Sequence, residues 1–83
     1  MASKLRPVEV TWVDSAMENG WTGESSMISA VGIAHCMSCG YLLSKDKEVV
    51  KLVMSHGTSP SGTSYMDGLA IPMCAVVKIR NLS

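Results

Sequence analysis

Apolar and polar residues alternate with a period of two along much of the chain, which is the pattern of β-strands that bury one face. Residues 8–14 show it first and are rich in β-branched and aromatic side chains. Val8, Val10 and Trp12 lie on one side of this predicted strand. An Asn-Gly pair and a further glycine then favour an irregular loop over residues 15–23.

The next segment has the period of a helix. Its apolar stripe recurs at helical spacing and consists of Met27, Ile28, Val31 and Ala34. Glu24 stands where the first turn would be and suits the positive end of the helix dipole. Residues 24–34 are therefore predicted to form a helix.

Further along, the period returns to two and polar turns divide the chain. The predicted elements are, in order, a strand at 36–44, a turn at 45–47, a strand at 48–55, a loop at 56–67, a short strand at 68–71 and a last strand at 75–82. The first two of these strands form a hairpin. The loop is rich in Gly, Ser, Thr and Pro and is long for a compact domain, which points to a functional role.

These elements predict one mainly β domain over residues 1–83, with a single helix between its first and second strands. Five short strands are too few for a sandwich. They are enough to close a small barrel, and closure removes exposed strand edges. The predicted fold class is therefore α+β, as a five-stranded small barrel.

The amino-acid composition restricts the classes of function that this chain can have. Seven basic and seven acidic residues balance, so no overall field attracts duplex DNA. Hydrophobic residues make up 47% of the chain and charged residues only 17%, which favours a homo-oligomer. Apolar runs fall short of the roughly 20 residues that a membrane helix needs, and the first residues lack the apolar run of a secretory signal. We therefore expect a cytoplasmic protein that does not bind membranes.

Short motifs spread over nearly the whole chain carry a family resemblance. They are Thr11-Trp12-Val13-Asp14-Ser15, Gly20-Trp21, Gly40-Tyr41-Leu42-Leu43, Val49 to Ser55, Ala70-Ile71-Pro72 and Ile79-x-x-Leu82. With them the chain resembles a family of short, mostly unannotated proteins of tailed bacteriophages and prophages. It departs from the family pattern after Pro72, where Met73 and Cys74 stand in place of a basic residue.

The resemblance implies an SH3-like or Sm-like barrel with a short helical turn near Ile71 and Pro72, before the final strand. It further implies assembly through outer strands and residence in the host-cell cytoplasm. Some small phage proteins of this size counter host immunity by sequestering nucleotide second messengers. That role is the functional expectation that the resemblance lends to this chain.

Metal binding and catalysis receive little support from the residues. Four side chains offer zinc-ligand chemistry, namely His35, Cys36, Cys39 and Cys74. Residues three apart on a strand point to opposite faces, so Cys36 and Cys39 chelate together only across a turn. We interpret the cysteines as small apolar residues and expect no metal and no cofactor. No nucleophile elbow or paired-carboxylate arrangement is present, so we expect a protein that is not an enzyme.

Ligand-binding chemistry gathers in two glycine-containing segments. Hydroxyl and backbone donors with an aromatic ring can hold a phosphate and a base without net positive charge. The candidate binding residues are Asp14, Ser15, Trp21, Ser55, Thr58, Ser59, Ser61, Thr63 and Tyr65. The alternatives are a solvated loop for the second segment, a barrel cap for Trp21 and a turn cap for Asp14 with Ser15.

We therefore expect a homo-oligomer that holds a small nucleotide-derived ligand between subunits, a cyclic oligonucleotide immune signal according to the resemblance, without converting it. One alternative is an Sm-like RNA-binding ring, against which the zero net charge argues. Another is an inhibitor that binds a host protein through an exposed apolar strand. A small hydrolase is a further alternative, and it would release an altered ligand.

Overall fold

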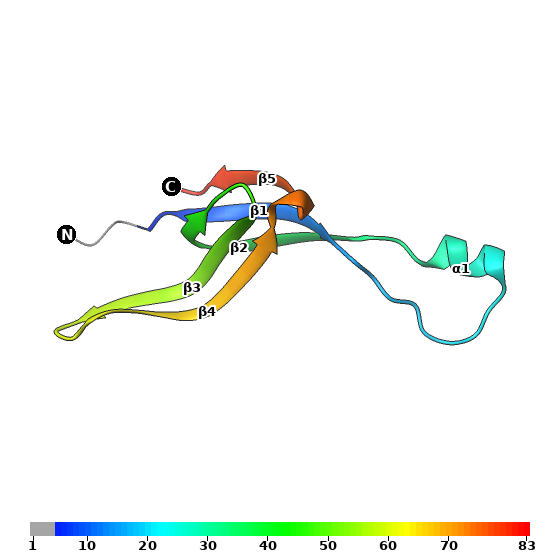
Figure 1. Cartoon of the computed structure of the whole chain (residues 1–83), viewed down its shortest axis with the longest axis horizontal. Coiled ribbons are helices and arrows are strands. Elements are labelled where there is room, and N and C mark those ends of the chain that lie inside the picture. Colours follow the sequence, from blue (N-terminus) through cyan, green and yellow to red (C-terminus); the bar gives the residue numbers. More distant parts are fainter. Residues whose placement is uncertain (1–4) are drawn as a thin grey trace.

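Five strands, a short α-helix and a single 3-10 turn make up the regular structure of residues 5–83, which the computed structural model describes (Figure 1). The elements are β1 (Pro7–Asp14), α1 (Glu24–Ala30), β2 (Ala34–Lys45), β3 (Val49–Ser59), β4 (Gly62–Pro72), η1 (Met73–Ala75) and β5 (Val76–Asn81). The prediction of a mainly β chain with a helix between its first two strands is confirmed. The turn η1 precedes the last strand, near the position that the resemblance implies.

The strands form one antiparallel sheet in the order β4-β3-β2-β1-β5. The first four strands follow one another as a meander, and β5 returns to pair with the free side of β1. Val8 lies opposite Asn81, and the Leu82 amide donates to the Pro7 carbonyl. The sheet stays open, with β4 and β5 as its edges, so it does not close into the predicted barrel.

Two irregularities bend this sheet. The register between β2 and β3 shifts between Leu42 and Ser44, and that between β1 and β5 shifts at Thr11 and Trp12. Such bulges bend strands and increase their twist. The bends curl the sheet so that side chains of β1, β3 and β4 meet in one cluster.

That cluster is the core of the described chain. Val8 and Val10 of β1 are buried against Val50 and Leu52 of β3 and Ile71 of β4. Val8, Val10 and Trp12 of β1 face inward, as their alternation predicts, whereas Asp14 at the end of the strand is exposed. Trp12 packs at the edge of the cluster, and its indole N–H donates to the Ser38 hydroxyl at 3.0 Å.

Two predicted elements are wrong in their extent. Residues 56–67 were expected as an irregular loop, but most of them continue β3 and begin β4 on either side of a tight turn at Pro60 and Ser61. β-branched and aromatic side chains opposite one another stabilise this pairing despite the glycines. The helix predicted to reach residue 34 ends at Ala30, because the backbone is already extended at Val31, ahead of β2.

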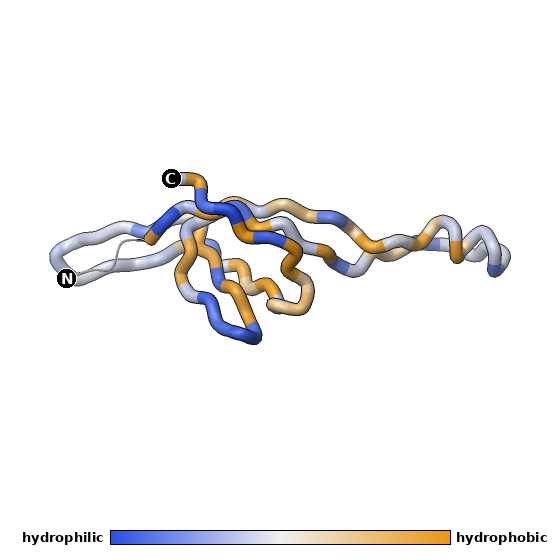
Figure 2. Tube along the Cα trace, turned by 90° about the horizontal axis from the view of Figure 1, so that it is seen from above, coloured by the Kyte–Doolittle hydropathy of each residue, from blue (hydrophilic) through white to orange (hydrophobic). Residues whose placement is uncertain are grey.

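The molecule is strongly elongated. Its radius of gyration is 17.3 Å and its longest extent 60 Å, whereas a compact chain of this length has a radius near ~12 Å. Two segments project in opposite directions from the sheet in both views (Figures 1 and 2): residues 55–66, here the outer hairpin, and residues 15–33, here the α1 arm. Figure 2 shows hydrophobic positions in the sheet and again along the α1 arm, while the outer hairpin is paler.

Candidate functional site

The outer hairpin brings most of the predicted binding residues together and sorts them onto two faces. Cross-strand partners project to the same side of a ribbon, and successive pairs alternate between its sides. The pairs on one side are His56 with Tyr65 and Thr58 with Thr63; those on the other are Ser55 with Met66, Gly57 with Ser64 and Ser59 with Gly62. Ser55 and Ser59 therefore do not share a face with Thr58, Thr63 and Tyr65.

The first side carries the rings of His56 and Tyr65, and together with the adjoining Tyr41 ring of β2 it is called here the aromatic face. Tyr65, about half exposed, lies opposite His56. The His56 ring stands edge-on to the Tyr41 ring of β2, with centroids 4.7 Å apart and planes at 89°. Beyond them the hydroxyls of Thr58 and Thr63 lie 3.3 Å apart. The aromatic face thus places a stacking ring beside hydroxyl groups that donate and accept hydrogen bonds.

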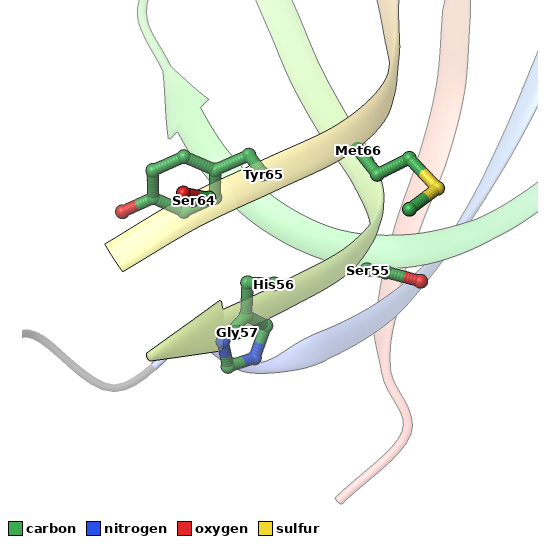
Figure 3. Close-up of a pocket in the computed structure, with 6 residues that line it drawn as sticks. All are labelled: Ser55, His56, Gly57, Ser64, Tyr65 and Met66. Atoms are coloured by element: carbon green, nitrogen blue, oxygen red, sulfur yellow. The ribbon is translucent and has the colours of Figure 1, made fainter. Parts of the chain in front are cut away.

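An open pocket of about 330 Å³ lies on the outer hairpin. Its lining comes from both sides of the ribbon, with His56 and Tyr65 from the aromatic face and Ser55, Gly57, Ser64 and Met66 from the other side. Figure 3 shows Ser55 and Met66 projecting to one side of the hairpin, and His56 and Tyr65 to the other. Gly57 contributes no side chain, which leaves the backbone open to a ligand at this point. The volume lies at the lower end of small-molecule sites, which span about 300–1,000 Å³.

The tip of the hairpin is held by its own hydroxyls. Ser59 and Ser61 hydroxyls lie 2.9 Å apart, and Gly62 has a φ of +125°, a backbone conformation that favours glycine. The Ser59 hydroxyl also points to the Gly62 carbonyl at 3.5 Å. Ser59 and Ser61 thus contribute to the turn itself.

The remaining predicted residues lie elsewhere. Asp14 ends β1, and its carboxylate accepts the Ser15 backbone N–H at 2.8 Å, which fits the local turn alternative. Trp21 belongs to the α1 arm, is fully exposed, and its segment projects away from the outer hairpin (Figure 1). One chain therefore does not bring Trp21, Asp14 and Ser15 together with the hydroxyl-rich hairpin.

The candidate zinc ligands are spread over the fold. β2 is continuous from Ala34 to Lys45, so Cys36 and Cys39 point to opposite faces without a turn between them. Cys74 lies on η1. Among residues 5–83 no cluster of three or more His, Cys, Asp or Glu side chains is placed to hold a metal ion.

Charge near the site is modest. Lys51 of β3 is exposed, and on the edge strand β5 Arg80 forms an ion pair with Glu9 of β1 at 3.1 Å. Because more than half of the Arg80 side chain is exposed to solvent, this pair contributes little to stability. In the described part of the chain, no helix is long and apolar enough to cross a membrane.

Two members of the aromatic face were missed as binding residues. His56 stood in the candidate segment, but its partner could not be known without the β3–β4 register. Tyr41 comes close to it only because β2 pairs with β3, with Tyr41 opposite Val53. The period of two indicates which face of its own strand each residue occupies, but it does not show that Tyr41 and His56 lie beside each other.

Comparisons with known proteins assign this chain to no family. A scan of protein-family models, a search of curated proteins and a search of solved structures each find no match to this chain.

Proposed function

We propose that this chain is a self-associating binding protein that holds a nucleotide-derived ligand on its aromatic face and releases it unchanged. One observation carries the proposal: the half-exposed Tyr65 ring lies opposite His56, which is itself braced by Tyr41, and the Thr58 and Thr63 hydroxyls follow on the same side. A base would stack on Tyr65. The hydroxyls would bind its polar edge or a phosphate oxygen.

The strength of such contacts favours an assembly. Stacking of a base on an aromatic side chain contributes about 1–3 kcal/mol, whereas a dissociation constant of 1 mM already requires about 4 kcal/mol. One open face on one chain therefore holds a nucleotide weakly. Several copies that offer equivalent faces to a multivalent ligand raise its affinity by effective concentration. A cyclic oligonucleotide has this repeated chemistry.

The proposal also includes a more specific assignment of the fold. We regard the open sheet as an SH3-like or Sm-like small barrel whose closure is incomplete in the single chain. A meander of four strands, a 3-10 turn and a fifth strand beside β1 support this assignment. The resemblance to tailed-phage proteins supports the choice of ligand, a cyclic oligonucleotide that signals in host immunity, and of compartment, the host cytoplasm.

The test titrates purified protein with a panel of cyclic di- and trinucleotides by calorimetry. Tyr65→Ala should weaken binding about tenfold or more, while Tyr65→Phe should retain most of it because the stacking ring remains. Val77→Ala is the matched control, since Val77 is similarly exposed but lies on β5. Absence of binding to every member of the panel would overturn the proposal.

The fate of the ligand separates the alternatives. Ligand recovered intact after heating the complex supports sequestration, and ligand recovered as a cleaved product supports a hydrolase instead. Retention of a single-stranded RNA that falls steeply with salt would favour the RNA-binding ring.

A further inference from the structure

The α1 arm has apolar side chains with nothing over them in the described chain. The exposed ones are Met17, Trp21, Ile28, Val31 and Ile33. The helix α1 itself spans only Glu24–Ala30, has no side-chain N-cap and buries none of its residues. Isolated helices shorter than about 12–15 residues are marginal in water, so a helix this short needs a surface to pack on. The exposed apolar side chains of the α1 arm are therefore available for contact with another surface.

A receptive surface lies on β2, β3 and β4. Two adjoining hollows of about 270 and 180 Å³ meet at Leu52 and Leu69, with Cys39 and Met54 lining the first and Leu43 the second. These residues define the β3–β4 groove. Its floor is apolar, and Leu43, Met54 and Leu69 are all partly exposed there.

The exposed area indicates a second copy of the chain as the occupant. The chain exposes 6391 Å², roughly 1,600 Å² more than the ~4,800 Å² expected of a compact monomer of this mass. A stable interface buries about 800 Å² per partner. The excess, to which the projecting outer hairpin also contributes, is large enough for two interfaces per chain, one through the arm that a copy gives and one through the groove that receives another.

Charge determines the direction in which the arm would lie, because the groove carries one charge of each sign. Residues 15–33 contain the acids Glu18 and Glu24 and no Lys or Arg. The groove is flanked at one end by Lys51 and at the other by Asp67. Complementary charges set the register of an interface, so the acidic residues of the arm belong at the Lys51 end.

We propose that the α1 arm of one copy docks in the β3–β4 groove of a second copy, with Trp21 and Ile28 against the exposed side chains of Leu43, Met54 and Leu69. This inference rests on the self-association in the proposed function. It adds that the arm and the groove form the interface, and that repetition of this contact brings Trp21 of one chain to the sheet of another.

Cross-linking tests the contact directly. In a Cys36→Ser, Cys74→Ser background, Cys39 remains in the groove, and Ser29→Cys adds a thiol on the arm while leaving Trp21 and Ile28 in place. Chains labelled with ¹⁵N and unlabelled chains are refolded together and treated with a short bismaleimide. Peptides that join residues 29 and 39 with mixed labels support the proposal. Cross-links confined to one label, or none, overturn it. Val77→Cys in place of Ser29→Cys is the control and should give few such links.

Sedimentation supplies a second readout, without ligand. Trp21→Ser with Ile28→Ser should raise the dissociation constant of the assembly about tenfold or more, as expected for an aromatic anchor. Val77→Ser should leave it unchanged. The indole of Trp12, bound to Ser38, reports that the sheet remains folded. A wild-type monomer, or an arm variant that associates normally, overturns the inference, while the Tyr65 titrations decide ligand binding separately.

Discussion

His56 stands edge-on to Tyr41, with ring centroids 4.7 Å apart. The two residues lie on neighbouring strands, and Tyr41 is paired with Val53, three residues before His56 on β3. This contact connects the projecting outer hairpin with the body of the sheet. It also orients the ring that lies opposite Tyr65.

We expect Tyr41 and His56 to be energetically coupled. Edge-to-face aromatic pairs contribute about 0.5–1.5 kcal/mol beyond the area they bury. A double-mutant cycle of Tyr41→Leu, His56→Leu and the double variant should show a coupling of that size in the free energy of unfolding by urea. All four proteins must be compared at one concentration, because association shifts apparent stability. Strictly additive losses would contradict the coupling.

Ile71 is expected to dominate the stability of the sheet. It is fully buried where β4 meets β1 and β3, in a core with few members. Ile71→Ala should destabilise the fold by about 2–5 kcal/mol, because it removes apolar contacts and leaves a cavity. Val77→Ala, at an exposed position of β5, should stay within about 0.5 kcal/mol of wild type. Similar losses for the two variants in urea unfolding would contradict this assignment of the core.

The succession of strands and helix along the chain and the inward face of β1 could be predicted from the sequence, because they depend on local periodicity. Val8 and Val10 are core residues for that reason. The outer hairpin could not, since Gly57 and Pro60 are typical of loops and the pairing of Thr58 with Thr63 appears only with the register. Whether the sheet closes into a barrel depends on how the edge strands β4 and β5 lie relative to each other, which no local sequence pattern determines.

The candidate site shows the same division. Tyr65 and the threonines were identified by residue type within one segment. Tyr41 required the pairing of two strands, and Trp21 was grouped with the hairpin although its loop projects the other way. Residue chemistry is readable from a sequence, but its convergence depends on contacts between distant segments.

Gly40 is expected to be required by a close approach of backbone. A Cβ at this position would lie 3.1 Å from the Val53 carbonyl oxygen and 3.3 Å from the Leu52 Cβ. Gly40→Ala should therefore push β2 and β3 apart and destabilise the fold by about 1–3 kcal/mol. Gly68→Ala is the matched control, since its nearest neighbour would be at 3.8 Å, an ordinary contact. Equal urea midpoints for the two variants would refute the argument.

Asp46 should make stability depend on pH. Its carboxylate accepts the backbone N–H groups of Glu48 at 2.7 Å and Val49 at 2.9 Å, which closes the turn between β2 and β3. These two hydrogen bonds, that from Glu48 first, lower the pKa of Asp46 below its ordinary value. A carboxyl whose pKa is lower in the folded state stabilises the fold above its unfolded pKa of about 4. That contribution is lost as the pH falls through the folded value.

Asp46→Asn keeps an oxygen that accepts both N–H groups but removes the titration. Urea midpoints measured from about pH 6 down to pH 2 should therefore fall less steeply for this variant than for wild type. Asp46→Ala removes the acceptor as well, so it should be less stable than wild type at neutral pH, by a small amount because the turn is exposed. Parallel pH profiles for wild type and Asp46→Asn would show that the turn carboxylate does not couple folding to protonation.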